Sequence, residues 1–436
     1  MLHRAFAILL AVNAASAATA VDDAAAIFTR QCLPCHDARG SAPLRLDSVE
    51  RIARNRTLAR MLIEDATMPP SIALPDANGL LVDRRLSVAD RATLLNALSS
   101  SAFVNRAFAG ITSGAPADST EPTFAPPHGW TLPAAGGARV RTFIAATTNP
   151  NPNPNPSPNT ATATRVRGVR FADLGAREQR PIQMAFLAAD PRGILRRLEE
   201  ADDGADDGAE DGAENGGFEA MGNVGPVPSG ALGAVSRVRP SFELPDGFCF
   251  EIPVGFIAIE TLCEPIGRRT RVLPQLAWIP AREGDTRVVQ AIAMPAKALR
   301  LSANSCSTIE IVHPVAVDMD VVAVLVKGGA FLRSVDVEVE VEVELKVSDA
   351  GKAGAALRTR LLGVPDYRMA FAEPWIFTRP QRVAAGATIV ARLGFDNTAD
   401  NPQQPSRPPQ DVESGLPPLS EDAMVVVLYA PARNSR

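Results

Sequence analysis

The chain has 436 residues, a formal net charge of −5 and apolar residues at 46% of its positions. This length predicts two or three domains, with enough apolar residues for sizeable cores. The mild acidity and the lack of a basic stripe with interleaved aromatic residues exclude a typical nucleic-acid-binding protein. No run approaches the roughly 20 apolar residues that a transmembrane helix requires, so we expect no membrane span.

The first 20 residues have the pattern of a secretory signal peptide. His3 and Arg4 form a short polar start, Ala5 to Val12 is apolar, and Ala18-Thr19-Ala20 is a small-residue cleavage site. We therefore expect the mature chain to be exported, to the periplasm or out of the cell.

The segment Cys32-Leu33-Pro34-Cys35-His36 has the spacing of a site for covalent attachment of haem c. Each of the two thiols can bond to one vinyl group of the porphyrin, and the adjacent histidine can ligate the iron. A C-x-x-C pair also occurs in redox dithiols and in zinc sites. The following histidine, the predicted export and the lack of a second C-x-x-C favour haem.

A second axial ligand is offered by Met68, in Met68-Pro69-Pro70. A thioether ligand raises the iron potential and leaves no open coordination position, which suits electron transfer. Met61 is the alternative ligand, and Met68 could otherwise be a buried anchor of its loop.

Residues 21–101 are predicted to be a small all-α domain around this motif. Helical patterns cover Val21 to Arg30 and Ser48 to Leu62, with Asp47 or Ser48 as the N-cap of the second. Ser87 to Asp90 is a capping box that opens a last helix, which is expected to end in Ser99-Ser100-Ser101. The domain resembles class I cytochromes c, and this resemblance implies haem c as its cofactor. Residues 102–123, rich in small residues and proline, are predicted to be a linker.

Residues 124–432 show strand patterns without long helical patterns, which predicts an all-β region. Low-complexity inserts at 149–160 and 201–217 are predicted to be disordered, and the acidic second insert lacks the spacing of a calcium loop. Val335 to Val347 alternates apolar and charged residues, which predicts a strand with one buried face and one acidic face. The acidic face is expected to discourage edge-to-edge aggregation.

Three further cysteines and three tryptophans leave alternatives open. Cys249 and Cys263 could form a disulfide that leaves Cys306 over, or all three could be buried free thiols. The tryptophans could line a binding groove or pack in the core; they are Trp130, Trp278 and Trp375.

Segments near the end of the β region resemble the copper type II, ascorbate-dependent monooxygenases, the family that contains peptidylglycine α-hydroxylating monooxygenase. The segments are Phe395 to Pro402 and Ser420 to Met424, together with Gly363 to Tyr367 and Arg333-Ser334. The resemblance implies two tandem jelly rolls, over 124–280 and 281–432. Bacterial members of the family often carry an N-terminal haem domain, which agrees with residues 21–101.

The resemblance also implies two copper sites, one with three histidines and one with two histidines and a methionine. Where the family has histidines, this chain has Gln183-Met184, Leu262 to Pro265 and Lys327 to Phe331. Only Met424 stands where the methionine ligand belongs, as a vestigial copper ligand or as a core residue. A metal site formed by Cys263 and Glu264 in place of the missing histidines is a weaker alternative.

The mature chain has three histidines, His36, His128 and His313, and haem takes the first. Two histidines cannot build both copper sites, so copper is not expected and His128 and His313 are predicted to be ordinary surface or loop residues.

The sequence therefore predicts an exported monohaem cytochrome c that passes single electrons to redox partner proteins. Its double jelly roll is expected to lack monooxygenase activity, and no catalytic residue is assigned. The alternative is a copper- and haem-dependent monooxygenase in which the haem feeds electrons to copper. A third hypothesis is an extracellular interaction protein in which haem is mainly a folding element.

Overall fold

A computed structural model describes most of the chain. The described residues are 23–36, 44–65, 68, 80, 86–109, 111, 123–147, 163–172, 181–190, 192–197, 216–218, 230–237, 239–345, 353–369, 374–415 and 420–433. Of residues 34, 35, 342–345 and 353–356 only the backbone is described. The predicted signal peptide, insert 149–160 and most of insert 201–217 lie outside the described residues.

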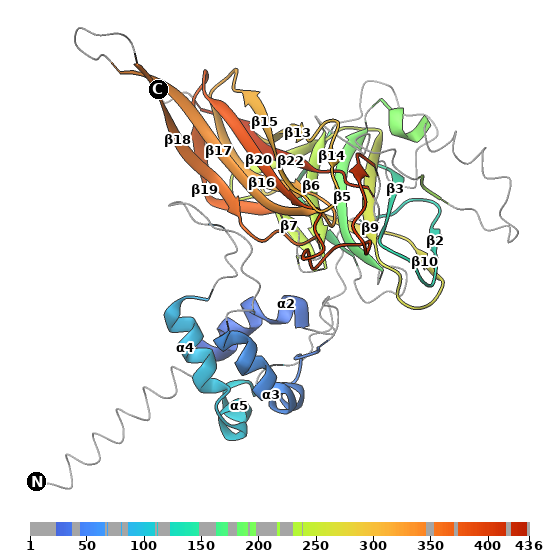
Figure 1. Ribbon diagram of the computed structural model, residues 1–436, viewed down its shortest axis with the longest axis vertical. Helices are drawn as coiled ribbons and strands as arrows, with labels where there is room; N and C mark the ends of the chain where they lie inside the picture. Colours follow the sequence, from blue (N-terminus) through green and yellow to red (C-terminus); the bar gives the residue numbers. More distant parts are fainter. Residues whose placement is uncertain are drawn as a thin grey trace, which may run out of the picture. The chain divides into compact units, whose positions relative to one another are not determined.

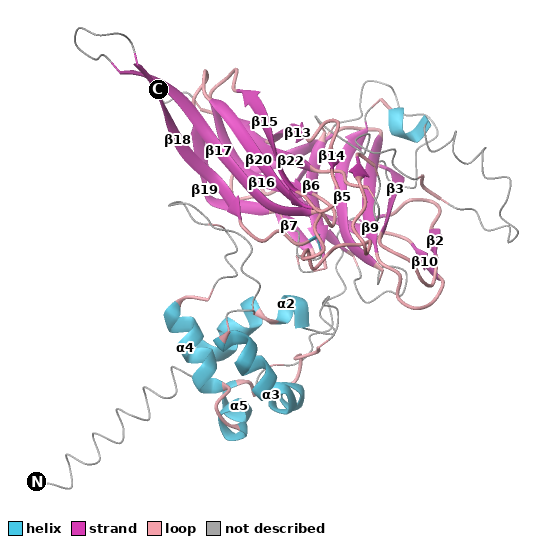
Figure 2. Ribbon diagram, in the orientation of Figure 1, coloured by secondary structure: helices cyan, strands magenta, loops and turns pink. Residues whose placement is uncertain are grey.

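The described residues form two compact units, one helical and one of β-strands (Figures 1 and 2). The helical unit takes its residues from 1–71 and 83–119. The β unit takes its residues from 72–82 and from 120 onward. The short stretch 72–82 thus belongs to the β unit although both of its flanks belong to the helical unit.

The described residues of the helical unit form five helical segments. They are residues 23–31, α2 (Leu33–His36), α3 (Val49–Glu64), α4 (Val88–Ala97) and α5 (Ser101–Ala107). Ser48 caps α3 by accepting a hydrogen bond from the backbone N–H of Arg51, and Ser87 caps α4 by accepting one from Asp90. Both predicted helix starts are confirmed, with Ser48 rather than Asp47 as the cap of α3.

Helix α5 corrects the predicted boundary at residue 101. Ser100 accepts a hydrogen bond from the N–H of Phe103, so the serine run that was expected to end α4 also starts a further helix. Val104 and Phe108 are fully buried, and the Phe108 ring lies 4.8 Å from the ring of Phe28, centroid to centroid. The predicted linker 102–123 therefore begins inside the core of the helical unit.

The β unit consists of antiparallel sandwiches formed in chain order. The first contains β1 (Thr123–Phe124), β2 (Trp130–Leu132), β3 (Arg139–Ala146), β4 (Thr164–Phe171), β5 (Ile182–Asp190), β6 (Ala231–Ser236), β7 (Ser241–Glu243), β8 (Phe248–Ile252), β9 (Phe256–Cys263), β10 (Thr270–Val272) and β11 (Leu276–Pro280). The second contains β13 (Gln290–Pro295), β14 (Arg300–Leu301), β15 (Cys306–Pro314), β16 (Met319–Lys327), β17 (Leu332–Leu345), β18 (Ala353–Val364), β19 (Trp375–Val383), β20 (Thr388–Asp396), β21 (Val412–Glu413) and β22 (Met424–Pro431).

The strand order identifies both sandwiches as jelly rolls. In the first, one sheet has the order β1-β11-β4-β8 and the other β3-β9-β5-β6; in the second, the orders are β13-β22-β16-β19 and β15-β20-β17-β18. Each sandwich has eight strands in these two sheets, and in chain order the first of them lies beside the last: β1 beside β11, and β13 beside β22. In the facing sheet the second pairs with the seventh: β3 with β9, and β15 with β20. This double Greek key is the jelly-roll arrangement. The prediction of an all-β region built from two jelly rolls is confirmed.

The junction between the jelly rolls differs slightly from the predicted boundary at residue 280. Strand β12 (Arg287–Val288) pairs in parallel with β8 of the first jelly roll. Successive side chains of β22 then point into two different apolar clusters. Val425 and Val427 belong to the interior of the second jelly roll, whereas Met424, Val426 and Leu428 belong to a cluster shared with the first. A strand buried on both faces explains the continuous apolar run in its sequence.

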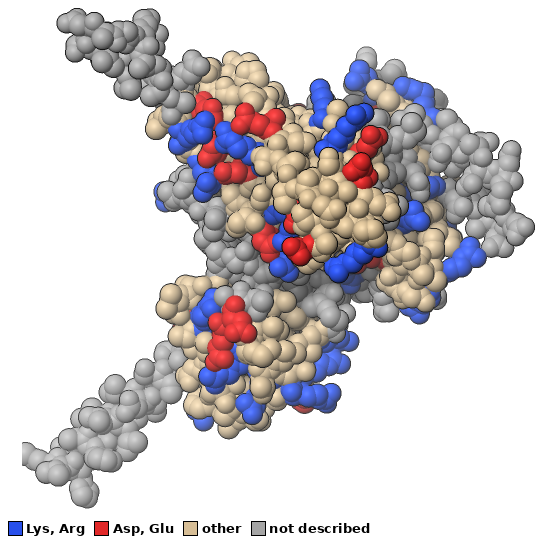
Figure 3. All heavy atoms as spheres, viewed as in Figure 1, with Lys and Arg blue, Asp and Glu red and all other residues tan. Residues whose placement is uncertain are grey.

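Strand β17 does not protect a sheet edge, which corrects one interpretation of its alternating sequence. It is an inner strand between β20 and β18. Its outer face carries ion pairs: Arg392 of β20 lies 2.6 Å from Glu338 and 3.2 Å from Glu340, and Arg360 of β18 lies 2.9 Å from Asp336. Figure 3 shows acidic and basic side chains interleaved over β17 and β18.

The three cysteines of the β unit are free thiols, so of the two alternatives the disulfide between Cys249 and Cys263 is not formed. Those two are buried, but Cys306 is exposed at the start of the outer strand β15, so the alternative of three buried thiols is wrong for Cys306. The tryptophans are buried in the apolar clusters, which supports core packing. In the first jelly roll the ring of Trp278 stacks on Phe124 at 4.3 Å.

Candidate functional site

The C-x-x-C-H segment lies at the end of the first helical segment. The backbone N–H of Cys32 donates to the carbonyl of Phe28 at 2.8 Å, and that of His36 donates to the carbonyl of Cys32 at 3.0 Å. Cys32 and His36 are thus one helical turn apart and share a face. Cys32 is half-buried against the apolar core of the helical unit. The side chain of Cys35 lies outside the described residues.

The imidazole of His36 is oriented by one hydrogen bond. Its Nδ1 lies 2.6 Å from the carbonyl oxygen of Leu44, and the backbone N–H of Leu46 donates to the His36 carbonyl at 2.7 Å. A carbonyl only accepts, so Nδ1 carries a proton, and Nε2 is the ring nitrogen left for a metal. A metal-ligating histidine characteristically donates its other ring N–H to a carbonyl or carboxylate. The hydrogen bond to Leu44 therefore holds the ring in the way that such histidines are held.

The two candidate thioethers lie at the end of α3 and just beyond it. The backbone N–H of Met68 donates to the carbonyl of Leu62 at 3.0 Å, and its side chain is half-buried. Met61 is 47% exposed. Neither side chain belongs to the apolar core of the helical unit. The choice of Met68 over Met61 as sixth ligand stays a prediction.

Helix α3 also presents apolar side chains outside the core. Leu58 is 42% exposed and precedes the exposed Met61 by three residues, so the two share a face of the helix. Single exposed apolar residues are normal on protein surfaces, so this pair by itself does not point to a ligand. A thiol, an oriented imidazole and thioethers in one small unit fit a haem c.

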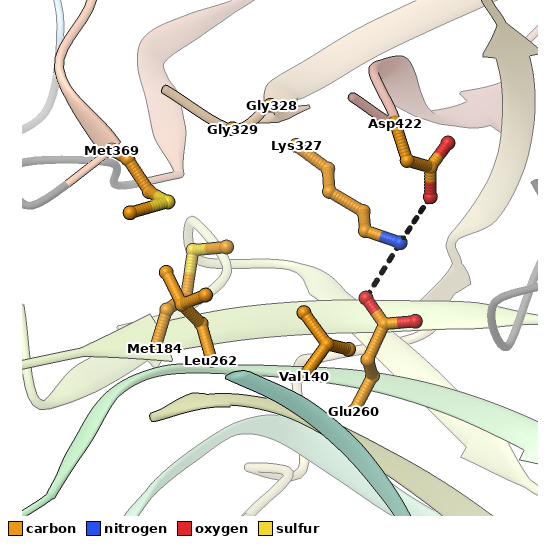
Figure 4. A pocket seen from close by; sticks show the side chains of 9 residues that line it. All are labelled: Val140, Met184, Glu260, Leu262, Lys327, Gly328, Gly329, Met369 and Asp422. Carbon is orange, nitrogen blue, oxygen red and sulfur yellow. Dashed lines mark hydrogen bonds and ion pairs between the residues drawn. The ribbon is translucent and has the colours of Figure 1, made fainter. Parts of the chain in front are cut away.

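The positions at which the monooxygenase resemblance implies copper ligands come together in the β unit. Met184 of β5 pairs with Leu262 of β9, and Lys327 of β16 pairs with Met424 of β22. A pocket where the two jelly rolls meet contains most of these residues (Figure 4). Its lining residues are Val140, Met184, Glu260, Leu262, Lys327, Gly328, Gly329, Met369 and Asp422.

An ammonium group between two carboxylates dominates the polar end of this pocket. The Lys327 Nζ lies 2.6 Å from Glu260 Oε1 and 2.7 Å from Asp422 Oδ2, and the side chains are 12%, 5% and 9% exposed. Burial, the largest influence, lowers the pKa of Lys327, but the two carboxylates outweigh it and the net pKa is raised. Lys327 is therefore charged at any physiological pH.

The neighbouring residue, Glu421, is fully buried. Its carboxylate accepts hydrogen bonds from the backbone N–H groups of Gly329 at 2.5 Å and Phe331 at 2.9 Å. Burial nevertheless raises the pKa of Glu421 to about 7. A Cβ at position 329 would lie 2.9 Å from both Glu421 oxygens, so a larger residue there would displace the carboxylate. Gly329 and Phe331, which stand where the resemblance implies a His-x-His segment, thus bind a carboxylate through their backbone N–H groups.

The structure assigns no copper chemistry to this pocket. None of its lining residues is a histidine. His128 precedes β2 in the first jelly roll, and His313 lies on β15 of the second. Met424 is buried in the apolar cluster, in agreement with core packing. In the described part of the chain, no group of three or more His, Cys, Asp or Glu side chains is placed to hold a metal ion.

The described residues do not build a metal site around Cys263 and Glu264. Burial raises the pKa of the Cys263 thiol to about 12, and burial also raises the pKa of Glu264. Since the described residues bring no group of three potential ligands together, a metal site at these two residues is not supported.

Sequence reasoning missed the three charged residues of the pocket. The signal was present: Lys327 ends the apolar run of β16, and Glu260 interrupts the apolar run of β9. A charge inside a strand that is otherwise buried requires a partner. The identity of that partner depends on the packing of the two jelly rolls, which the sequence does not reveal.

Neither a protein-family profile nor a curated protein matches this chain. Among solved structures, the major capsid protein P2 from bacteriophage PM2 is 10% identical, with 72% of this chain and 99% of that chain covered and a TM-score of 0.23. The VP2 subviral particle of infectious bursal disease virus is 9% identical, covering 74% and 84%, with a TM-score of 0.15. Scores this low carry no argument, so the jelly-roll assignment depends on strand order alone. No helix in the described ranges is long and apolar enough to cross a membrane.

Proposed function

We propose that this protein is an exported monohaem c-type cytochrome that transfers single electrons. The observation that carries the proposal is His36 in the C-x-x-C-H segment, with its Nδ1 directed to the Leu44 carbonyl and its Nε2 left for iron. The helical unit supplies the haem site. The jelly rolls serve as a docking module, without copper and without monooxygenase activity of their own.

Attachment of the haem depends on Cys32 and Cys35. The two thiols would hold the haem, each through a thioether to one vinyl group. Since Cys32 begins the turn that ends at His36, a haem held by Cys32 would bring the imidazole within reach of the iron.

His36 and Met68 are the proposed axial ligands. The bond from His36 Nδ1 to Leu44 holds the ring orientation and strengthens Nε2 as a donor. Met68 would supply a thioether to the iron, which would favour its reduced form. When bound, haem c supplies a one-electron couple that exchanges electrons through its exposed edge.

Export and redox partner proteins belong to the same proposal. The signal-peptide pattern of residues 1–20 supports a periplasmic or secreted location, where haem attachment takes place outside the cytoplasm. The copper- and haem-dependent monooxygenase is not favoured by any contact in the pocket, because the aligned positions hold methionine, leucine, lysine and glycine.

The test is haem and metal content of the full chain, produced in a periplasm with haem-attachment machinery. We expect one iron per chain and a mass increase of one haem that survives denaturation. Cys32→Ser and Cys35→Ser should each leave at most one thioether, visible as a shifted pyridine haemochrome band. Cys306→Ser is the matched control, because Cys306 is an exposed cysteine of the other unit, and it should behave as wild type.

Wild-type protein without attached haem under these conditions would refute the proposal. Stoichiometric copper alongside iron would instead favour the monooxygenase alternative, and ascorbate-driven hydroxylation would then be the assay.

A further inference from the structure

Lys327 has surroundings in which an amine and a carboxyl group can react with each other. Its Nζ lies 2.7 Å from Asp422 Oδ2 and 2.6 Å from Glu260 Oε1. The side chain of Lys327 is only 12% exposed, whereas Lys297, the other lysine of the described residues, is exposed. An ammonium group that contacts two carboxylates in so little water is a reactive arrangement as well as an ion pair.

The sheet of the second jelly roll fixes Lys327 and Asp422 relative to each other. Lys327 ends β16 and pairs with Met424 at the start of β22, and Asp422 lies just before Met424 in the chain. The two reacting residues are 95 residues apart in sequence and meet because β16 and β22 are neighbours. The carboxyl carbon of Asp422 is one bond beyond the oxygen that Nζ contacts. The nitrogen and the carbon it would attack are therefore held together by the fold.

Glu260 contacts the same nitrogen from the first jelly roll. It lies on β9, and its side chain is 5% exposed. Its Oε1 contacts Nζ, whereas its Oε2 is buried and has no hydrogen-bond partner among the described residues. Burial favours the neutral form of a carboxyl group, and an unpartnered oxygen is free to take the proton. Glu260 is therefore placed to accept a proton from the nitrogen and to release it again.

Apolar side chains surround the charged group on its other side. Figure 4 shows Met184, Leu262 and Met369 beside Lys327, and Val140 beside Glu260. Transfer of a proton from Lys327 to Asp422 converts two charged groups into two neutral ones, and a buried apolar site opposes this conversion less than water does. The pocket is also large enough to hold a water molecule.

We propose that Lys327 and Asp422 condense to form an amide cross-link, with Glu260 as the catalytic residue that moves the proton. A proton first passes from Nζ to the Asp422 carboxylate across their 2.7 Å contact, which leaves a neutral amine beside a neutral acid. The nitrogen then attacks the carboxyl carbon, Glu260 takes a proton from the nitrogen, and this proton goes to the departing oxygen. One C–N bond forms, one C–O bond breaks and one water leaves, so no oxidant or further reactant is needed.

The raised pKa of Lys327 is compatible with this step. It means that Lys327 does not lose its proton to water, whereas the proposed transfer moves the proton to Asp422 within the pair. A small population of the neutral pair is enough, because each chain that reacts leaves the ion-paired population for good.

The cross-link gives the β unit a covalent connection that its cysteines do not provide. Cys249, Cys263 and Cys306 are free thiols. An amide between Lys327 and Asp422 closes a loop of the chain whose ends are 95 residues apart and attaches the start of β22 to β16. A cross-link of this kind restricts the unfolded chain, as a disulfide does.

The experiment maps peptides of the purified full chain in four forms: wild type, Glu260→Gln, Lys327→Arg and Lys297→Arg. Each form is denatured and digested, and mass spectrometry identifies the peptides. We expect wild type to give a joined species of the Lys327 and Asp422 peptides that is lighter than their sum by one water. Wild type should also run faster than Lys327→Arg on a denaturing gel, because the closed loop keeps the denatured chain more compact.

The variants separate the roles of the three groups. Glu260→Gln keeps both reacting groups and the shape of the side chain but cannot carry the proton, so the joined fraction should fall by about tenfold or more. Lys327→Arg keeps the positive charge without a reactive amine and should give no joined species. Lys297→Arg is the matched control at an exposed lysine and should behave as wild type. Tryptophan emission checks that each variant is folded, since the tryptophans are buried in the β unit.

Separate Lys327 and Asp422 peptides from folded wild type would overturn the proposal and leave the contact as an ion pair. A link from Lys327 to Glu260 would overturn it as well, because the wrong carboxyl group would have reacted. An undiminished link in Glu260→Gln would overturn the role of Glu260. If Glu260→Gln does not fold, the wild-type map still decides whether the amide exists. The reaction requires no haem, so chains with and without haem should give the same map, and failure of the haem proposal would leave this inference standing.

Discussion

Replacing Lys327 with methionine tests the charged group between the jelly rolls. The ammonium of Lys327 lies between Glu260 of the first jelly roll and Asp422 of the second. Lys327→Met keeps most of the apolar part of the side chain and leaves two buried carboxylates without a counter-charge. We expect a large loss of stability in the β unit, because a buried charge without a partner is strongly unfavourable.

The expected size of the loss follows from the geometry. At N···O separations of 2.6 and 2.7 Å, each attraction amounts to about 6 kcal/mol at an effective dielectric constant of about 20. Desolvation of all three groups opposes this attraction. Removing one partner of a buried ion pair typically costs about 3–5 kcal/mol. All three side chains are at least 88% buried by the exposures given above, so screening by water does not reduce this figure greatly.

Urea unfolding followed by tryptophan fluorescence measures the effect. The three tryptophans of the chain all lie in the β unit, so their emission does not report on unfolding of the helical unit. Lys297→Met is the matched control, since Lys297 is an exposed lysine of the same jelly roll, and we expect it to change stability by less than about 0.5 kcal/mol. Adding Glu260→Gln and Asp422→Asn to Lys327→Met should recover much of the loss. Equal effects of Lys327→Met and Lys297→Met would refute the reasoning.

Three further predictions concern the haem ligand, pH and surface charge. Met68→Ala should keep the attached haem, lower its potential and admit carbon monoxide. Met61→Ala should keep the haem and change neither the potential nor carbon monoxide binding; the reverse pattern would identify Met61 as the ligand. The pKa of Glu421 is about 7 in the folded state and 4.5 in the unfolded state, so the folded state binds the proton more tightly. This group stabilises the folded state fully below pH 4.5, and about 3 kcal/mol of that stability is lost as the pH rises through 7. Urea titrations at a series of pH values measure the free energy of unfolding against pH, and Glu421→Gln should make that dependence flatter. Arg392→Ala should cost no more than about 1 kcal/mol, with a smaller cost at high salt, because Arg392 and its partner carboxylates are partly exposed.

Local signals in the sequence predicted much of the fold. Ser48 and Ser87 marked true helix starts because an N-cap depends only on residues within one turn. Alternation and apolar runs likewise marked the strands that became β16 and β17. The helix after Ser100 was missed because a serine run is equally compatible with a helix end and with the next helix start.

The long-range features were not accessible from the sequence. The inner position of β17 and the partners of Lys327 depend on segments that are tens of residues apart in the chain. For the haem segment, the spacing of Cys32, Cys35 and His36 was enough to predict haem attachment. The structure added the hydrogen bond from His36 Nδ1 to the Leu44 carbonyl. The sequence could not have identified Leu44, because a backbone carbonyl has no residue preference.

The position of β22 sets the order in which the second jelly roll can assemble. β22 lies between β13 and β16, the first and third main strands of that jelly roll, so the sheet lacks an inner strand until residues 424–431 are in place. Contacts this distant in sequence form slowly. Until β22 is in place, β13 and β16 each have an unpaired edge on an apolar strand. This delay suits the export that we propose, because the domain cannot close while its last strand is still in transit. Removal of residues 424–431 should therefore abolish the second jelly roll as a whole and leave the helical unit folded.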